Sequence, residues 1–459
     1  VSRKANTNAA ASYLKQGLEN FAGDTFFDSV SELLPAHSFV YDLKTFKFET
    51  SKYYNLKTNN IWESYDEKKC GEHIAHVRDK VLNAVDLRLH ADVAVGSCLS
   101  GGMDSSAIVC SIEKLLTNRQ YDSVGKRQGV VTACYDNFHL DESSWAKIVV
   151  DSTGADWHKT YPLREELLSD LSDLVYSQDV PFGSTSIYAQ YRVMKSAKEA
   201  GLTVMLDGQG GDELFTGYTP YYKMFYEELL LNEEYDLISN EQKCIGNTPF
   251  KDYDIMESIK PRKKKSAIRR MVPKPIKNVI LYCLKKNKEN YISAKSGVYP
   301  SIKYDSLNGM LAALMTNSSL PQLLKYEDRN SMRFSVESRT PFADDVDLIE
   351  YVFNIPASYK IHNGWSKFLL RESMKGIVPD KIRKRTDKIG FNTPEYEWLA
   401  KIKPLVFASN HPELESIIKM KKLESNWDVL MSKQNKSGIT DIWRYINYIL
   451  WFDIYKVCV

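Results

Sequence analysis

The sequence predicts an α/β fold, in which a doubly wound parallel sheet is followed by a helical C-terminal part. Three observations support this prediction. Apolar runs typical of strands alternate with helical patterns between residues 93 and 206, and two glycine-rich turns, at 99–106 and 207–217, each follow such a run. From residue 304 onward the pattern is helical. Ligands of doubly wound sheets bind at the carboxyl ends of the strands, so both turns are expected at one edge.

The individual elements follow from the same periodicities. Two short alternating runs, 39–42 and 46–54, are typical of strands near the N-terminus. The expected sheet elements, in chain order, are a strand at 93–96, a helix at 107–112, a strand at 130–135, a helix at 144–150, a helix at 188–200 and a strand at 202–206.

The turn at residues 99–106, LSGGMDSS, has the composition of a phosphate-binding loop. Gly101 and Gly102 can adopt backbone angles closed to other residues, which lets successive N–H groups face one anion. Ser105 and Ser106 are expected to cap the following helix, whose N-terminus adds positive potential. Asp104 would repel phosphates unless a cation lay between them, so the loop implies Mg²⁺.

Composition excludes several classes of protein. The chain has 459 residues, 43% of them hydrophobic, which suits two or three packed globular units. A net charge of +2 gives no global field for nucleic acid or membrane. No apolar stretch is long enough for a transmembrane helix. The scattered, odd set of seven cysteines fits buried free thiols in a reducing cytoplasm.

Residues 260–288 hold twelve Lys or Arg and no acidic residue. We interpret this run as part of a solvated insertion, residues 240–300, with a short helix at 276–284. A nucleic-acid site is the less favoured interpretation, because aromatic residues that would stack on bases are not interleaved with the charges.

Four motifs in order carry a family resemblance. They are SGGMDS at 100–105, VMLDGQGGDELFTGY at 204–218, YEDRNSM at 326–332 with ESRTPF at 337–342, and RTDKIGF at 385–391. The first resembles the pyrophosphate loop of the ATP pyrophosphatases, whose sheet is of the adenine-nucleotide α-hydrolase type. Together they resemble the synthetase domain of the glutamine-hydrolysing asparagine synthetases, over residues 70–459.

Residues 1–60 resemble the tail of the glutamine amidotransferase domain that precedes the synthetase domain in that family. The family's nucleophile is an N-terminal cysteine, whereas the first cysteine here is Cys70. We therefore expect a truncated chain that uses ammonia rather than glutamine.

The resemblance implies an ATP-dependent ligase of asparagine biosynthesis. It forms asparagine from aspartate and ammonia through an acyl-adenylate and releases AMP and pyrophosphate. The implied metal ligands are Asp104 and Asp212, and Lys388 is the implied catalytic cation. The implied ATP-binding residues are Leu99, Ser100, Gly101, Gly102, Asp104, Ser105, Ala133, Cys134, Asp207 and Gly208.

Two departures from the family bear on the chemistry. Gln209 stands where the best-known members have Glu, and a neutral amide cannot act as a base, so Glu327 or Asp328 is expected to take the proton. Glu337 and Arg339 are expected to form a structural ion pair near the site. The acceptor pocket is expected at 178–186, which lacks the family's arginine.

These departures keep other functions open. One is amide ligation to another acceptor, as in β-lactam synthetases or macrolactam-forming peptide cyclases. Independently of these departures, the basic run at 260–288 leaves open a tRNA-modifying ATP pyrophosphatase, and the missing amidotransferase half leaves open a non-catalytic binding remnant. The expected partners are small molecules, with neither nucleic acid nor membrane; a homodimer is compatible with the sequence.

Overall fold

The computed structural model describes residues 2–19, 21, 23–136, 139, 141–244, 291–294, 304–386, 393–409, 411–431 and 439–459. The basic run and the helix expected at 276–284 lie outside the described residues, as does Lys388.

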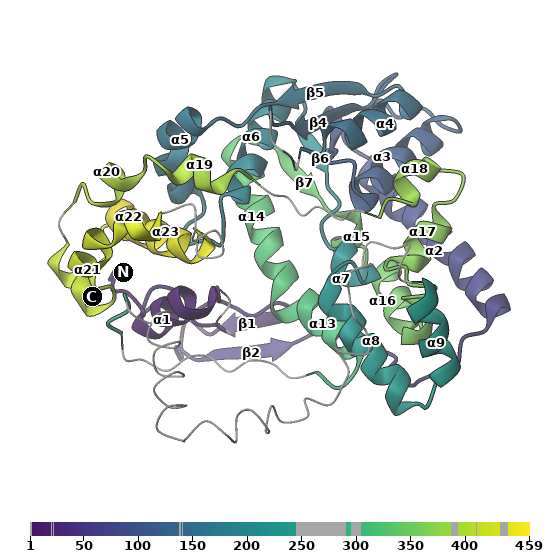
Figure 1. Ribbon diagram of the computed structural model, residues 1–459, viewed down its shortest axis with the longest axis horizontal. Coiled ribbons are helices and arrows are strands. Elements are labelled where there is room, and N and C mark those ends of the chain that lie inside the picture. The colour runs from purple at the N-terminus through teal and green to yellow at the C-terminus, as the bar shows by residue number, and fades with distance from the viewer. Residues whose placement is uncertain are drawn as a thin grey trace.

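A five-stranded parallel sheet forms the centre of the fold, in the order β5-β4-β3-β6-β7 (Figure 1). Its strands are β3 (Val95–Cys98), β4 (Gly129–Ala133), β5 (Asp156–Thr160), β6 (Val204–Leu206) and β7 (Glu337–Arg339). The chain runs outward from β3 through β4 to β5, and then returns to place β6 on the other side of β3. This reversal confirms the doubly wound arrangement and puts the switch point at β3 and β6.

The two faces of the sheet contact different helices. Val130 belongs to the core that includes α2 (Glu67–Arg88) and α3 (Met103–Leu116), whereas Val131 packs with Val193 and Met194 of α6 (Ser186–Glu199). Successive strand residues point to opposite faces, so this alternation follows from a strand buried on both sides.

Further helices lie between residues 143 and 430, some between the strands and most after them. They are α4 (Ser143–Thr153), α5 (Arg164–Ser177), α7 (Gly211–Phe215), α8 (Thr219–Leu231), α9 (Tyr235–Cys244), α13 (Leu307–Asn317), α14 (Ser319–Arg333), α15 (Pro341–Asp344), α16 (Val346–Asn354), η2 (Ala357–Tyr359), α17 (Phe368–Ser373), α18 (Asp380–Arg383), α19 (Glu395–Leu399), α20 (Lys403–Val406), η3 (Pro412–Ser416), α21 (Met420–Ser425) and α22 (Trp427–Leu430).

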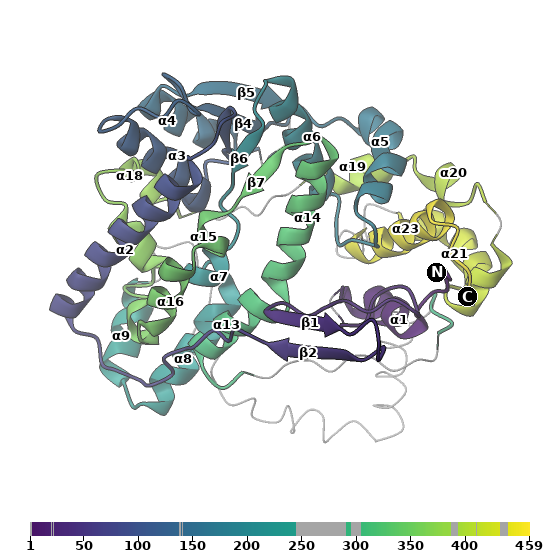
Figure 2. The same cartoon turned by 180° about the vertical axis from the view of Figure 1, so that it is seen from behind.

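A second hydrophobic core joins the two ends of the chain. Tyr13 of α1 (Thr7–Gln16) and Phe26 pack in one cluster with Leu171 of α5 and Trp443 of α23 (Ile439–Ile454). A β-bridge between Lys4 and Cys458 brings the termini together, as Figures 1 and 2 show. The N-terminal segment is thus packed into the helical C-terminal part.

An exposed hairpin, β1 (His37–Tyr41) and β2 (Phe48–Lys52), forms a separate two-stranded antiparallel sheet (Figure 2). Every residue of β2 is exposed, and so are four of the five residues of β1. An isolated two-stranded hairpin is marginal in water. Its alternating pattern was predicted from sequence, but the apolar side chains, such as Phe46 and Phe48, lie in solvent.

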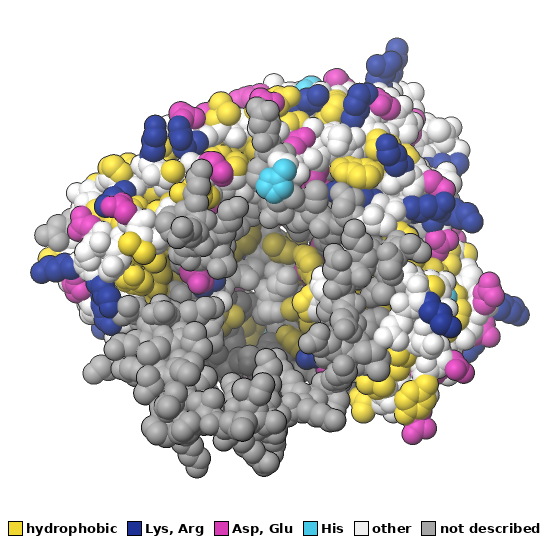
Figure 3. All heavy atoms as spheres, in the orientation of Figure 1, with side chains coloured by type: hydrophobic (Ala, Val, Ile, Leu, Met, Phe, Trp, Pro, Cys, Tyr) yellow, Lys and Arg dark blue, Asp and Glu magenta, His cyan; other side chains and the backbone are white. Residues whose placement is uncertain are grey.

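The sequence located most of the sheet elements to within a few residues. β3 begins at Val95 rather than Val93, and neither β5 nor the short polar strand β7 was expected. The described cysteines are free, but Cys458 is exposed, so the expectation of buried thiols is wrong there. Among the described residues every helix is too short or too polar to span a bilayer. Figure 3 shows one face hollowed near its centre, with hydrophobic side chains in the walls.

Candidate active site

A cavity of about 460 Å³ lies where β3 and β6 end. This size is ordinary for a small-molecule site. Most of the ATP-site residues expected from sequence line it: Leu99, Ser100, Gly102, Asp104, Ser105, Ala133, Asp207 and Gly208, together with Asp212. The two glycine-rich turns, which lie over a hundred residues apart in sequence, therefore form one site.

The first turn is shaped by Gly101, whose φ of 77° lies in the left-handed region. A Cβ at Gly101 would stand 2.4 Å from the backbone nitrogen of Ala146, so the turn is packed against the start of α4. Gly102, by contrast, has an ordinary extended conformation and is itself the N-cap of α3.

The expectation that Ser105 and Ser106 cap this helix is wrong, because both lie within its first turn. The hydroxyl of Ser105 instead accepts a hydrogen bond from the backbone N–H of Ser100 at 3.2 Å. It also lies 3.0 Å from the hydroxyl of Ser100. The serines thus brace the loop from within.

Lys367 brings the two expected metal ligands together. Its ammonium group contacts Asp104 and lies 2.6 Å from Oδ1 of Asp212. Burial lowers the pKa of Lys367, but the charges of Asp104 and Asp212 outweigh that effect and hold it above 10.5. Lys367 precedes α17 in a left-handed conformation, with φ of 54°, which is strained for a residue with a side chain.

The donor set fits a divalent cation. Two carboxylates from different turns converge on one position, and Mg²⁺ prefers such oxygen ligands. Glycines surround them: a Cβ at Gly211 would stand 2.7 Å from Oδ1 of Asp104, and one at Gly217 would overlap Oδ1 of Asp212. Asp212 lies within α7, whose N-cap is Gly210, so Asp212 is not itself a cap.

Arg385 contacts the turn at 99–106 and the start of α4. Its guanidinium pairs with Glu142 at 2.8 Å and donates to the carbonyl of Gly101 at 3.3 Å. It also lies 4.5 Å from the ring centroid of Trp145. Arg385 is the first residue of the fourth motif, so the start of that motif lies beside the first one.

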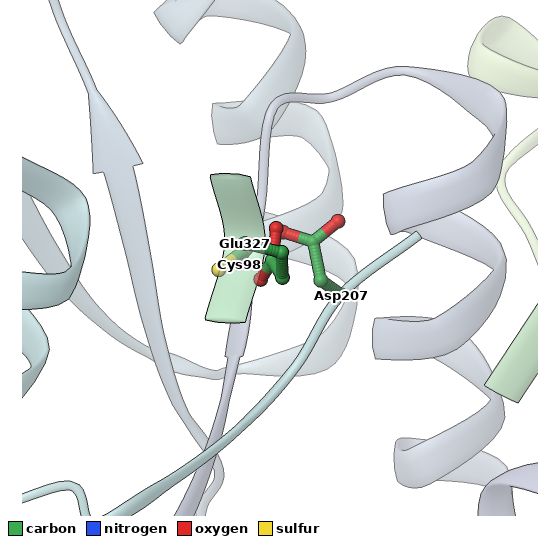
Figure 4. A group of neighbouring side chains, drawn as sticks. All are labelled: Cys98, Asp207 and Glu327. Atoms are coloured by element: carbon green, nitrogen blue, oxygen red, sulfur yellow. The ribbon is translucent and has the colours of Figure 1, made fainter. Parts of the chain in front are cut away.

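An acid pair lies at the cavity (Figure 4): Asp207 is half-buried and lines it, whereas Glu327 is buried and does not line it. Sγ of Cys98 and carboxylate oxygens of Asp207 and Glu327 all lie within 4.8 Å of one another. Burial raises the pKa of Glu327 well above 4.5, and the charge of Asp207 raises it further. Burial also raises the pKa of Asp207. Like charges this close disfavour ionisation of both groups at once.

Glu327 is held by neutral side chains. Ser338 donates to its Oε1 at 2.6 Å, and Gln190 donates to its Oε2. Gln209 also hydrogen-bonds the Glu327 carboxylate. The amide at position 209 thus supports an acid supplied by α14.

Part of the expected acceptor segment reaches the same cavity. Gly183, Ser184 and Ser186 line it, beside Gln190 and Tyr326. The backbone of the segment is fixed at Phe182, whose N–H donates to Asn447 at 2.7 Å and whose carbonyl accepts from Trp443 at 3.0 Å. Helix α23 therefore also holds the acceptor segment.

Several expected residues lie elsewhere. Asp328 is exposed and pairs with Arg329 at 2.6 Å. Gly101 and Cys134 do not line the cavity. Glu337 and Arg339 do form the expected ion pair, at 2.7 Å, but Arg339 contacts the carbonyls of Arg88 and His90 rather than the cavity.

Lys367 and Gln190 were missed by sequence reasoning. Lys367 stands alone before an apolar helix, and Gln190 lies in an ordinary amphipathic one. The one signal in the sequence is that Lys367 directly precedes three apolar residues, at 368–370.

A doubly wound sheet with two glycine-rich turns and paired carboxylates at the ends of its central strands is the architecture of the ATP pyrophosphatase fold. The family model described as asparagine synthase matches residues 76–452. The chain therefore belongs to the asparagine synthase family, whose members are ATP-using ligases.

Curated relatives agree with this membership. The chain is similar to "Asparagine synthetase [glutamine-hydrolyzing] 1" of Bacillus subtilis, with 28% identity over 71% of this chain and 50% of the relative. It is 24% identical to "Asparagine synthetase [glutamine-hydrolyzing] 3" of that organism, over 95% of this chain and 68% of the relative. "Amidase chyE" of Penicillium rubens is 27% identical over 84% of this chain and 62% of its own length. The chain thus spans half to two-thirds of these relatives.

Proposed function

We propose that this chain forms an amide from a carboxylate and ammonia with ATP, through an acyl-adenylate, and releases AMP and pyrophosphate. Aspartate is the acceptor that the names of the bacterial relatives support. The observation that carries the proposal is that Asp104 and Asp212 both contact the ammonium group of Lys367 in the cavity. Gln190 and Gln209 line another side of this cavity and hydrogen-bond Glu327.

In the first step a carboxylate oxygen bonds to the α-phosphorus, and the bond to the β-phosphate oxygen breaks. The loop at 100–105 and the ammonium of Lys367 hold the β and γ phosphates, while Leu99, Ala133, Asp207 and Gly208 hold the adenosine. Asp104 and Asp212 would bind Mg²⁺, which neutralises charge on pyrophosphate. Fixed cations of this kind favour the charge that develops as pyrophosphate leaves.

In the second step the nitrogen of ammonia bonds to the acyl carbon, and the bond from that carbon to the AMP oxygen breaks. The nitrogen must then lose a proton. In this proposal the acid pair takes that proton: Asp207 lines the cavity, and Gln190 and Gln209 hold Glu327 next to it. Lys388 remains the proposed cation for the acyl oxygen; it lies outside the described residues.

Residues 1–60 are, in this proposal, the tail of a glutamine amidotransferase domain. The hairpin β1–β2 supports this assignment because both of its faces are exposed, as expected of strands that continue a larger sheet. The bacterial relatives named as glutamine-hydrolysing are also longer than this chain.

A second candidate is amide ligation to a different carboxylate. The described side chains of the acceptor segment that line the cavity, Ser184 and Ser186, are uncharged, and their neighbours Ile187 and Gln190 are uncharged as well. Such a wall suits an acceptor without a free α-carboxylate, because that group is usually held by a cation.

The products and the acceptor test both candidates. The purified chain would be incubated with ATP, MgCl₂, ammonium chloride and either L-aspartate or Nα-acetyl-L-aspartate α-amide, which keeps the β-carboxylate but removes both α charges. AMP and pyrophosphate with L-aspartate support the first candidate, and the same products with the blocked compound alone support the second. ADP and phosphate contradict both.

The nitrogen donor is tested in the same assay. Ammonium chloride should support amide formation, and glutamine should not, because residues 1–60 contain no cysteine nucleophile. The rate with ammonium should rise with pH as free ammonia increases. Glutamine-dependent turnover by this chain alone would contradict the assignment of residues 1–60.

A further inference from the structure

We propose that Glu19, in the segment that follows α1, is a positioning residue for the acceptor: it fixes the hydroxyl of Tyr326 and, through it, the backbone of Gly183. Tyr326 and Gly183 both line the acceptor end of the cavity, whereas Glu19 lies behind them. The inference rests on the proposed function, because it assigns a role in binding the carboxylate substrate.

The link consists of two hydrogen bonds in series. The backbone N–H of Gly183 donates to the Tyr326 hydroxyl at 3.3 Å, and that hydroxyl donates to Oε2 of Glu19. Tyr326 is buried, so its hydroxyl depends on protein partners. Because one bond is accepted and the other donated, the hydroxyl proton has a fixed direction.

Glu19 is packed closely against the acceptor segment as well. A Cβ built on Gly183 would stand 3.1 Å from Oε1 of Glu19 and 3.5 Å from the Tyr326 hydroxyl. Burial raises the pKa of Glu19 to about 7, while the hydrogen bonds from Tyr326 and Gln322 and the charges of Lys325 and Arg444 oppose that rise. The carboxylate therefore has a defined place between α14 and α23.

Phe182, which precedes Gly183, is also held by the N-terminal segment. Tyr13 of α1 donates to the carbonyl of Phe182 at 2.7 Å. The N-terminal segment therefore contacts two successive residues of the acceptor segment, Phe182 through Tyr13 and Gly183 through Glu19. Substrate-positioning groups act by holding the reacting geometry, and small displacements reduce efficiency.

Four variants test the inference. Glu19→Ala removes the acceptor of the Tyr326 proton, Tyr326→Phe removes the link itself, and the double variant measures their coupling. Asp28→Ala is the control, because Asp28 belongs to the same N-terminal segment but is exposed. Initial rates would be measured with ATP, ammonium chloride and L-aspartate, or with the blocked aspartate if only that compound is used.

Glu19→Ala and Tyr326→Phe should each raise the KM for the carboxylate roughly fivefold or more, with kcat and the KM for ATP within about twofold of the parent. The double variant should resemble the single variants, because both changes break one chain of bonds. Asp28→Ala should match the parent. Parent-like KM values in Glu19→Ala, or an equal loss with ATP, would overturn the proposal.

A second measurement does not depend on turnover. Amide hydrogen exchange in peptides covering residues 180–190 should become faster in Glu19→Ala and stay unchanged in Asp28→Ala, while peptides covering 99–106 exchange as in the parent. Unchanged exchange at 180–190 overturns the positioning role. Absence of AMP with every carboxylate would count against the proposed function, and exchange would still decide the role of Glu19.

Discussion

Lys367 Nζ lies 2.6 Å from Oδ1 of Asp212, and the same ammonium group contacts Asp104. A lysine thus stands between the two carboxylates that the sequence assigns to a divalent cation. Its side chain is 5% exposed, so the charges meet in a poorly solvated place. Breaking such an arrangement by removing one partner leaves uncompensated buried charge.

Replacing Lys367 should affect both ATP cleavage and stability. Lys367→Met should lower ATP cleavage roughly 100-fold or more, the magnitude typical of a lost electrostatic donor. It should also lower the melting temperature, because Asp104 and Asp212 then repel each other. Added MgCl₂ should raise the melting temperature of this variant more than that of the parent. An equal response of both proteins would contradict the position assigned to the cation.

The two carboxylates should each be required for ATP cleavage. Asp104→Ala and Asp212→Ala should abolish Mg²⁺-dependent pyrophosphate release rather than raise only the KM for the acceptor. Asp151→Ala is a suitable control, because Asp151 forms an exposed pair with Lys147 on α4. Near-parental release in either test variant would remove that residue from the metal site.

Substitutions of the neighbouring acids Glu327 and Asp328 should have very different effects on amide formation. Glu327→Gln should lower amide formation about 100-fold or more, while exchange of labelled pyrophosphate into ATP continues, since the base acts after adenylation. Asp328→Asn should leave both rates near the parental values, because Asp328 faces solvent and pairs with Arg329. Loss of exchange in Glu327→Gln would instead assign Glu327 to adenylate formation.

Buried Lys360 should make stability depend on pH. Burial lowers its pKa from 10.5 to about 7, although the charge of Glu228 opposes this. The folded state therefore binds fewer protons than the unfolded state between these values, so the free energy of unfolding should rise as pH increases from 7 to 10. Below pH 7 Lys360 is protonated in both the folded and the unfolded state, so it no longer makes the free energy of unfolding depend on pH.

Thermal unfolding between pH 6 and 10 checks this prediction. Lys360→Met should be more stable than the parent at pH 7 and should lack the rise in unfolding free energy. Lys147→Met, which removes an exposed lysine, should keep the parental slope. A parental slope in Lys360→Met would show that another group causes the dependence.

The backbone of the turn at 99–106 could be predicted because its information is local. A strand, a left-handed glycine and a helix start lie within ten residues, and Gly101 has the expected backbone angle. The capping role of Ser105 failed because the helix begins earlier, at Met103. Propensity cannot place a helix start to within a residue.

Long-range partners could not be predicted in the same way. Glu19 and Tyr326 are 307 residues apart and meet through packing of α1 against the C-terminal helices. Lys367 has no motif around it, and its role depends on its position opposite Asp104 and Asp212. Strand β7 escaped prediction because three residues with charged ends carry no alternating apolar pattern.

The two ends of the cavity belong to different hydrophobic clusters. Leu99 and Phe215, beside the phosphate turns, pack in one, whereas Phe182 and Tyr326, at the acceptor end, pack in the other. Packed clusters of this kind open as separate cooperative units. Under the proposed function, substitutions in the second cluster should change the choice of carboxylate without loosening the turns proposed to bind ATP, which is how one fold can come to serve new acceptors over evolution.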